Sequence, residues 1–256
     1  MNAQSHRIVP ILFCFLIFIV PLQAQSLRYV YTEYYPANYL DVNGNPAGFF
    51  VEIITEALTN RMGIPVEIEV FPWRRCQTLV QNGEADMMTT IPTAERCSYA
   101  VSTKTPLWIK RYHLYTRKDH PETGTMNSIS SIEDIALHKF SAISYLGNSW
   151  SQDNLEQRGI PVIYATSVEG MYRMLTAKRG DMLIDDPVLV DPALKNFGYE
   201  NIILMTSGVV AESSFHPMLG KKSIFIDRVD ELDATLGEMW KDGTIEKILE
   251  TYRTGR

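Results

Sequence analysis

The residues of this chain whose chemistry suits a small charged ligand gather between Tyr34 and Arg96. Over that stretch the chain reads YYPANYLDVNGNPAGFFVEIITEAL, then PWRRCQTLVQNGEAD, then TAER. An arginine presents a planar fork of donors that matches a carboxylate, and aromatic rings offer apolar area and a face that attracts cations. The sequence contains no G-x-S-x-G, H-E-x-x-H, P-loop or cluster of metal ligands. We therefore expect binding in place of catalysis, with no catalytic residues, no metal and no cofactor.

The order and spacing of these residues resemble the first lobe of the extracellular solute-binding proteins of family 3, the periplasmic receptors of amino-acid uptake systems. The pattern is an aromatic-Pro turn, a D-x-x-G-x-x-x-G-F segment, an aromatic before a helix that ends in G-x-x-D, and a T-x-x-R. The matching residues are Tyr34 and Pro36, then Asp41, Gly44, Gly48 and Phe49, then Trp73, Gly83 and Asp86, then Thr93 and Arg96. A weaker resemblance covers nearly all of the chain after residue 25. It implies an α/β fold, the two-lobed periplasmic-binding-protein-like fold of type II, with the ligand cleft between the lobes.

The resemblance also implies positions for a ligand carboxylate. Arg96 stands at the family's carboxylate-binding position, and a surface arginine in a solvated turn is the alternative. Asn148 and Ser149, after Gly147, match the family's Gly-Thr turn at a helix start, where backbone N–H groups lack partners and favour an anion. A simple N-cap is the competing interpretation of that turn.

Aromatic and hydroxyl side chains complete the site that the resemblance implies. Tyr34 and Trp73 correspond to the aromatics that flank the ligand in the family, with core packing as the alternative. Thr89 and Thr90 would add hydroxyl contacts. The segment from Asp86 to Arg96 is shorter than the usual family spacing, so the exact contacts depend on the fold.

A carboxylate in the second lobe is the natural partner of a ligand ammonium, and the sequence DMLIDDP supplies two candidates. Counting from Asp181 selects Asp186, and counting back from Pro187 selects Asp185. We favour Asp186. The other aspartate would then be an ordinary residue of a solvated turn.

The first 24 residues have the layout of a secretory signal. A basic start at His6 and Arg7 leads into an apolar run from residue 8 to residue 22, and we expect cleavage after Ala24, with a membrane anchor as the alternative. Removal of 24 of the 256 residues leaves 232, and the formal charge moves from -6 to -7 because Arg7 is lost. That balance argues against nucleic acid as a partner, since nucleic acid requires a basic face.

Alternating strand and helix patterns favour an α/β architecture. We expect strands at 27–32, 66–70, 86–90, 140–144, 162–164, 182–184, 202–205 and 223–224. The expected helices cover 49–62, 72–82, 132–135, 150–157, 168–178 and 229–240, with a last one from residue 244.

By resemblance, the chain leaves the first lobe, builds the second and returns. The expected limits are 25–116 for the first part of lobe 1, 117–205 for lobe 2 and 206–256 for the return segment. Hinge segments are expected at 115–118 and 203–208.

The mature chain keeps two cysteines, Cys76 and Cys97. Export to an oxidising compartment would allow a disulfide between them. Two separate thiols are equally compatible with the sequence, because the Cα separation that the bond requires is not known.

The function that the resemblance implies is a monomeric periplasmic solute-binding protein that captures an amino acid or related small carboxylate. Its partners would be that ligand and a membrane permease complex of an ABC-type transporter, and no nucleic acid. The alternatives are a ligand-sensing module without a transporter and a dehydratase-like periplasmic enzyme, because a fold does not fix a function.

Overall fold

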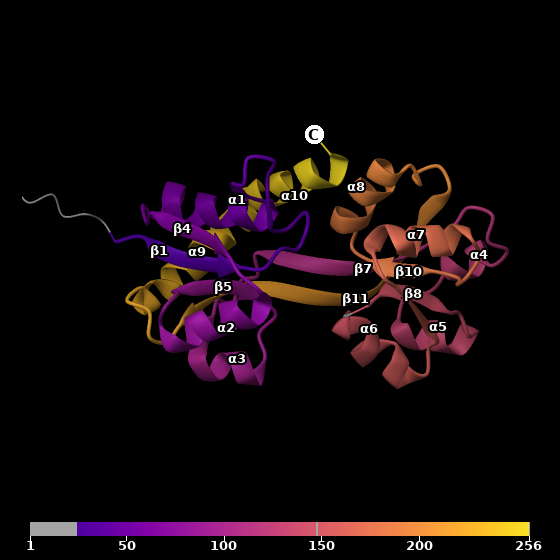
Figure 1. Cartoon of the computed structure of the whole chain (residues 1–256), viewed down its shortest axis with the longest axis horizontal. Helices are drawn as coiled ribbons and strands as arrows, with labels where there is room; N and C mark the ends of the chain where they lie inside the picture. Colours follow the sequence, from indigo (N-terminus) through magenta and orange to yellow (C-terminus); the bar gives the residue numbers. More distant parts are fainter. Residues whose placement is uncertain (1–24, 147, 256) are drawn as a thin grey trace, which may run out of the picture.

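Two lobes joined by a pair of long strands make up the protein (Figure 1). The structure, a computed structural model, describes residues 25–146 and 148–255, so the expected signal at 1–24 lies outside it. The connecting strands, β7 (Trp108–Arg117) and β11 (Ile203–Gly220), pair with each other in antiparallel fashion. Within the described ranges, no helix is both long and apolar enough to cross a membrane.

The first lobe is a sheet with helices on both faces (Figure 1). Its strands are β1 (Leu27–Tyr31), β4 (Val66–Val70), β5 (Met87–Thr90), β6 (Ala100–Ser102) and the end of β11, with a small hairpin of β2 (Tyr39–Leu40) and β3 (Pro46–Ala47). Its helices are α1 (Phe49–Thr55), continued by a π-helical segment at Glu56–Arg61, and α2 (Trp73–Asn82), α3 (Ala94–Tyr99), α9 (Val229–Lys241) and α10 (Thr244–Thr254).

Strand β1 lies between β4 and β5 and is parallel to both. Helix α1 connects β1 to β4 and α2 connects β4 to β5, and the two helices cover opposite faces of the sheet (Figure 1). The side chains of β1 alternate accordingly: Tyr29 packs into the core that contains α1, and Val30 into the core that contains α2. Because the connections diverge at β1, a crevice forms beyond the carboxyl ends of these strands, which is where α/β sheets bind ligands.

The D-x-x-G-x-x-x-G-F segment fixes the turn that carries Tyr34. Asp41 accepts hydrogen bonds from backbone amides of its own loop, and Gly44 adopts a φ of 79° there. Gly48 has a φ of 119°, and a Cβ atom at this position would lie 2.3 Å from the carbonyl oxygen of Ala37. That carbonyl instead accepts a hydrogen bond of 2.9 Å from the amide of Phe50. Only glycine fits here, so the turn is held closely against the start of α1.

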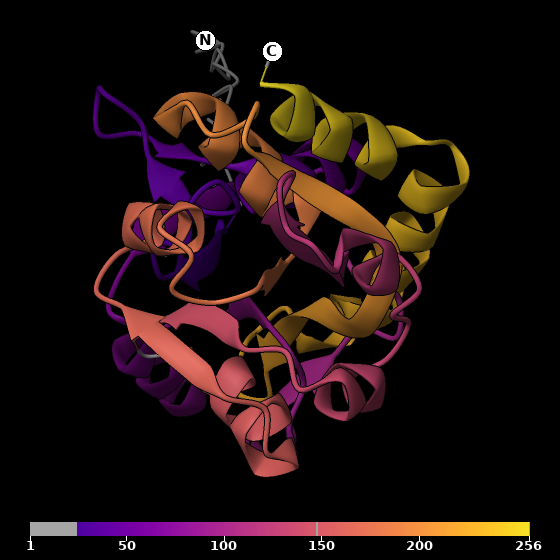
Figure 2. The same cartoon turned by 90° about the vertical axis from the view of Figure 1, so that its right-hand side faces the viewer.

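The second lobe has strands β8 (Ala142–Tyr145), β9 (Val162–Ala165) and β10 (Leu183–Asp185) beside the first half of β11 and the second half of β7. Its helices are α4 (Thr123–Met126), α5 (Ile132–His138), α6 (Ser149–Asn154), a 3-10 turn at Glu156–Arg158, α7 (Val168–Thr176) and α8 (Pro187–Phe197). Helix α8 packs against α10 of the first lobe (Figures 1 and 2).

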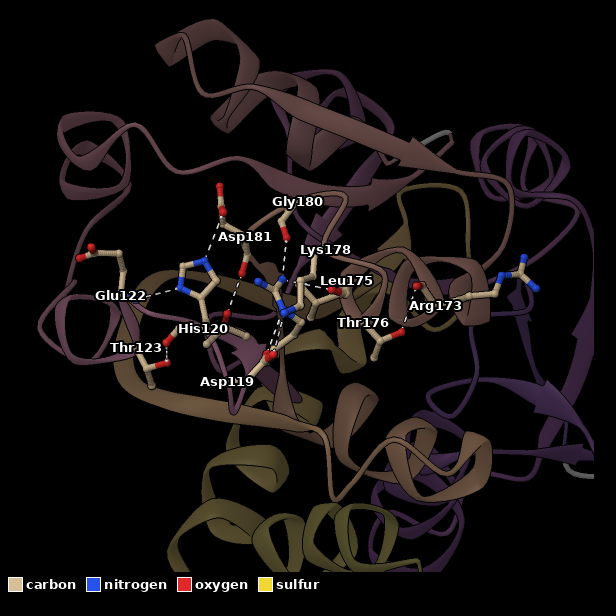
Figure 3. Close-up of polar contacts among 12 residues, drawn as sticks. Asp119, His120, Glu122, Thr123, Arg173, Leu175, Thr176, Lys178, Gly180 and Asp181 are labelled. Carbon is tan, nitrogen blue, oxygen red and sulfur yellow. Dashed lines mark hydrogen bonds and ion pairs between the residues drawn. The ribbon is translucent and has the colours of Figure 1, made fainter.

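A polar cluster around Asp181 ties together the starts of β8 and β10, and Figure 3 shows its contact with His120. The amide of Glu122 donates to Nδ1 of His120, so the Nε2 proton of that ring donates to Asp181 at 3.2 Å. The other oxygen of Asp181 accepts from the amide and hydroxyl of Ser141 at 2.7 and 2.6 Å. Burial raises the pKa of Asp181, but Ser141 and His120 outweigh it and hold the pKa below its ordinary value. The cluster therefore fixes the two strands whose far ends reach the candidate site.

The points where the chain crosses between the lobes can be found from the hydrophobic core to which each residue of β7 and β11 belongs. Trp108 and Phe215 belong to the core of the first lobe, whereas Tyr112 and Val210 belong to that of the second. The hinge segments predicted at 115–118 and 203–208 begin at residues of the second-lobe core, Tyr115 and Ile203. We therefore propose crossing points at 109–111 and 212–214, closer to the first lobe than the predicted limits after residues 116 and 205.

Several elements depart from the sequence prediction. Strand β7 was not predicted, strand β11 extends far beyond the segment expected at 202–205, and residues 223–224, expected as a strand, belong to no strand. Helix α8 was not predicted because Pro187 reads as a stop. In the structure Pro187 occupies the start of the helix, where a missing N–H is harmless.

The disulfide left open by the sequence is absent from the described residues: both Cys76 and Cys97 are free. Cys76 lies on the buried face of α2, with its Sγ 3.5 Å from the carbonyl oxygen of Phe71. Cys97 is exposed on α3. The two side chains belong to different environments, and burial raises the pKa of the Cys76 thiol to about 11, which makes it a poor nucleophile.

Candidate functional site

The larger cavity, of about 680 Å³, has walls from both lobes. The first lobe contributes Glu33, Tyr34 and Tyr35, directly after β1. The second lobe contributes mostly apolar and aromatic side chains and a few polar ones. These lining residues are Ile143, Ser144, Tyr145, Asn148, Val168, Met171, Tyr172, Leu183, Ile184, Asp185, Leu189, Val190, Ala193, Asn196 and Phe197. Cavities of roughly 300 to 1,000 Å³ with apolar walls and a few placed polar groups are typical of small-molecule sites.

An ion pair between a buried lysine and a half-buried aspartate lies at the wall of this cavity. The ammonium of Lys110, on β7, is 2.7 Å from Oδ1 of Asp185 and 2.9 Å from the hydroxyl of Tyr34. It also lies over the ring of Tyr112, at 4.7 Å from the centroid. Burial lowers the pKa of Lys110, but the attraction of Asp185 and Tyr34 raises it by more than burial lowers it. The pKa therefore lies above its ordinary value, and the side chain is charged. Tyr34 and Asp185, which face the cavity, are thus joined through one cation.

The neighbouring aspartate has a different role. Asp186 is 4% exposed and caps α8: its Oδ1 accepts from the amide of Val188 at 2.9 Å, and its Oδ2 accepts from the amide of Arg111 at 2.6 Å. Burial raises its pKa to about 6. Asp186 lines a second, smaller cavity of about 420 Å³, whereas Asp185 lines the larger one. We therefore propose Asp185, in place of Asp186, as the second-lobe carboxylate of the site.

Arg96 lies with its guanidinium over the ring of Trp73, at 5.2 Å from the centroid. Its Nη1 donates to the carbonyl oxygen of Ile91 at 2.7 Å, and its Nε donates to Gln77 at 3.4 Å. Nη2 makes no hydrogen bond within residues 25–146 and 148–255. The guanidinium is therefore held from one side and keeps donors for a ligand oxygen.

The remaining predicted residues divide between two places. Tyr34 and Asn148 line the larger cavity, whereas Trp73, Arg96 and the buried pair Thr89 and Thr90 are not among its described lining residues. Trp73 comes after β4, and the two threonines and Arg96 stand at or after the end of β5. Both strands are parallel to β1, so their carboxyl ends lie at the same edge of the sheet as that of β1.

The helix start predicted for a carboxylate is α6, which Asn148 caps. Its Oδ1 accepts from the amide of Ser151 at 3.4 Å, and its Nδ2 donates to Ser144 at 3.0 Å. Asn148 is therefore an N-cap, as the competing interpretation of this turn expected. The backbone of Ser149 begins the helix, and Gly147 lies outside the described residues.

Comparison with known proteins identifies the family. The bacterial extracellular solute-binding proteins of family 3 match this chain over residues 28–255. The chain belongs to that family. The resemblance found in the sequence, and the two-lobed α/β fold that it implied, are therefore confirmed.

Individual relatives of this solute-binding protein are distant. The amino-acid-binding protein AabA of Dichelobacter nodosus is 22% identical over 228 residues, which cover 88% of this chain and 87% of that protein. The unliganded, open L-cystine solute receptor of Neisseria gonorrhoeae is 19% identical, with a TM-score of 0.69 and coverage of 90% of this chain and 92% of the receptor. A histidine kinase sensor domain with similarity to periplasmic binding proteins is also 19% identical, with a TM-score of 0.63 and coverage of 89% and 96%.

Two residues beside the candidate site, Lys110 and Tyr112, were not singled out from the sequence. They stand on β7, which was not predicted as a strand, and their neighbours come from distant parts of the chain. A period-2 alternation of buried residues along β7 could have indicated the strand, but not the ion pair. Within the described ranges, no group of three or more His, Cys, Asp or Glu could hold a metal ion.

Proposed function

We propose that this protein is a periplasmic receptor that captures an amino acid or related small carboxylate and presents its closed form to a membrane permease of the ABC type. One observation carries the proposal: the larger cavity takes its walls from the turn after β1 and from β8, β10, α7 and α8 of the other lobe. A ligand that contacts both walls favours the closed arrangement over the open one, because only such a ligand distinguishes the two states.

We assign the carboxylate of the ligand to Arg96 and to the donors at the start of α6. This assignment is supported by the Nη2 of Arg96, which has no hydrogen-bond partner in the described part of the chain, and by the position of Trp73 beneath the guanidinium. Closure of the two lobes would have to bring Arg96, at the carboxyl-end edge of the first-lobe sheet, to the cavity. Tyr34 and Asn148 would contact the rest of the ligand from opposite lobes.

The proposal is tested with the purified mature protein. Native mass spectrometry identifies any ligand that copurifies, and a thermal-shift screen of amino acids and their carboxylate relatives finds others. A true ligand at 100 times its Kd should stabilise the fold by about 2.7 kcal/mol. It should also be recovered unchanged after prolonged incubation.

Two other outcomes would contradict the proposal. Conversion of the ligand at catalytic rates would make the protein an enzyme on this scaffold. Binding without stimulation of uptake, when the protein is added to its reconstituted permease, would favour a sensing module.

A further inference from the structure

The surroundings of Lys110 form a site of the kind that recognises an ammonium group. Oδ1 of Asp185 and the hydroxyl of Tyr34 accept hydrogen bonds from its Nζ. The rings of Tyr112, Tyr34 and Trp108 lie around the charge, at 4.7, 5.7 and 6.0 Å from their centroids. A carboxylate together with aromatic faces is the combination by which proteins hold organic cations.

The cation in this site comes from the chain itself. Lys110 is 6% exposed, and its backbone is fixed in β7, opposite Ser213 of β11. Two of the three donors of its ammonium are used by Asp185 and Tyr34. The described lining residues of the cavity include no lysine or arginine that could compete with Lys110 for these two acceptors.

We infer that Lys110 takes the place of a ligand ammonium, so that the ligand of this receptor is a small carboxylate without an amino group beside its carboxylate. The inference rests on the proposed function and narrows it. Asp185 and Lys110 together are electrically neutral, so the pair has little attraction for a second cation. A ligand ammonium at hydrogen-bond distance from Asp185 would also meet the like charge of Lys110 in a desolvated place, where such repulsion is strong.

Glu33 is the other carboxylate of the cavity wall, and it is exposed at the first-lobe side. Its charge is hydrated, so it offers a much weaker hold on an ammonium than a buried carboxylate would. If Glu33 bound the amino group of an amino acid, the inference would fail. The test therefore includes this residue.

Matched pairs of acids that differ by the amino group provide the probes: L-leucine and 4-methylpentanoate, L-phenylalanine and 3-phenylpropanoate, L-glutamate and glutarate. Each Kd is measured by titration calorimetry on the wild-type protein and on three variants. Lys110→Met removes the internal ammonium and keeps the apolar stem, which leaves Asp185 free for a ligand. The double variant Lys110→Met with Asp185→Asn removes both charges and controls for altered packing. Glu33→Gln removes the exposed charge.

For at least one pair, we expect the wild type to bind the acid without the amino group about tenfold or more tightly than the amino acid. Lys110→Met should reverse that preference, and the double variant should not bind the amino acid. Equal or tighter binding of the amino acid by the wild type, whether or not Glu33→Gln abolishes it, would overturn the inference and leave the receptor function standing. If neither the wild type nor any variant binds any amino acid or carboxylate relative of the thermal-shift screen, the carboxylate-receptor function itself is overturned.

Discussion

The guanidinium of Arg96 is oriented by its neighbours, because it stacks on Trp73 and donates to the carbonyl oxygen of Ile91. Its Nη2 has no hydrogen-bond partner among the residues that the structure describes. An arginine held in this way loses little conformational freedom on binding, and its planar fork matches a carboxylate in a way that a lysine cannot.

Replacement of Arg96 by alanine should therefore weaken ligand binding by about 3 to 5 kcal/mol, because a desolvated ligand carboxylate loses its partner. That loss corresponds to roughly two to four orders of magnitude in Kd, measured by titration calorimetry. The stability of the unliganded protein should change less, since the partly exposed bond from the charged guanidinium to Ile91 contributes about 1.5 kcal/mol.

Arg74→Ala is the matched control for that experiment. Arg74 is exposed on the same helix as Trp73, so its loss removes the same charge from the same lobe without removing the fork. Equal losses of affinity in the two variants would mean that Arg96 acts only through the general field of the lobe. Arg96→Lys should fall between alanine and the wild type.

The raised pKa of Asp186 leads us to expect that the stability of the fold depends on pH. Its pKa is raised by burial to about 6 in the folded protein, against about 3.9 in an unfolded chain. The folded state therefore holds the proton more tightly, and the stability that this provides is complete below about pH 4 and is lost as the pH rises through 6. The loss amounts to about 3 kcal/mol of unfolding free energy.

Urea unfolding of the wild type and of Asp186→Asn between pH 4 and pH 7.5 measures this effect. Asparagine keeps an acceptor for the N-cap but does not titrate, so the difference between the two proteins should change by that amount over the interval. A difference that stays constant with pH would show that Asp186 keeps an ordinary pKa.

At the scale of elements, the tight turn before α1 leads us to expect graded losses of stability from three glycine-to-alanine substitutions. Gly48→Ala places a Cβ atom 2.3 Å from the Ala37 oxygen at a φ of 119°, so backbone must move. Gly44→Ala, at a φ of 79°, meets nothing within 4 Å and suffers strain alone, and Gly124→Ala has neither problem. We expect losses in unfolding free energy of about 3 kcal/mol or more, about 1 kcal/mol and about zero, respectively.

Chemical denaturation gives the three stabilities, and ligand affinity gives a second measurement. Because the turn held by Gly48 carries Tyr34, Gly48→Ala should weaken binding as well, whereas Gly44→Ala should not. Equal stabilities of the Gly48 and Gly44 variants would mean that the turn is free to move away from α1.

The elements that the sequence predicts well are those with local signals. Gly63 and Gly83 end the helices that precede them, and Val66, Ile68 and Val70 alternate as a strand should. Strands β7 and β11 have no such limits, because their length depends on pairing between residues such as Trp108 and Phe215, which are far apart in sequence.

The same distinction applies to the site. Tyr34, Trp73 and Arg96 belong to one ordered series of segments between residues 34 and 96, so the resemblance points to them together. The partnership of Lys110 with Tyr34 and Asp185 joins three separate segments, so it becomes visible only when the fold is known.

For the whole molecule, the cavity between the lobes predicts compaction on binding. A ligand that contacts both Tyr34 and Asn148 should lower the radius of gyration, measured by small-angle X-ray scattering at saturation. Arg96→Ala at the same ligand concentration should keep the value of the unliganded protein. An unchanged radius of the saturated wild type would mean that the ligand binds one lobe without closing the other upon it.

The path of β11 also governs the order in which the chain can be completed. This strand lies between β5 and β7 in the sheet, and the first-lobe core further requires Leu232, Leu236 and Ile245 from α9 and α10. The second lobe, by contrast, takes nearly all of its segments from one continuous stretch of chain. During synthesis the first lobe therefore cannot complete its core until the last two helices have been made, whereas nearly all segments of the second lobe are present earlier.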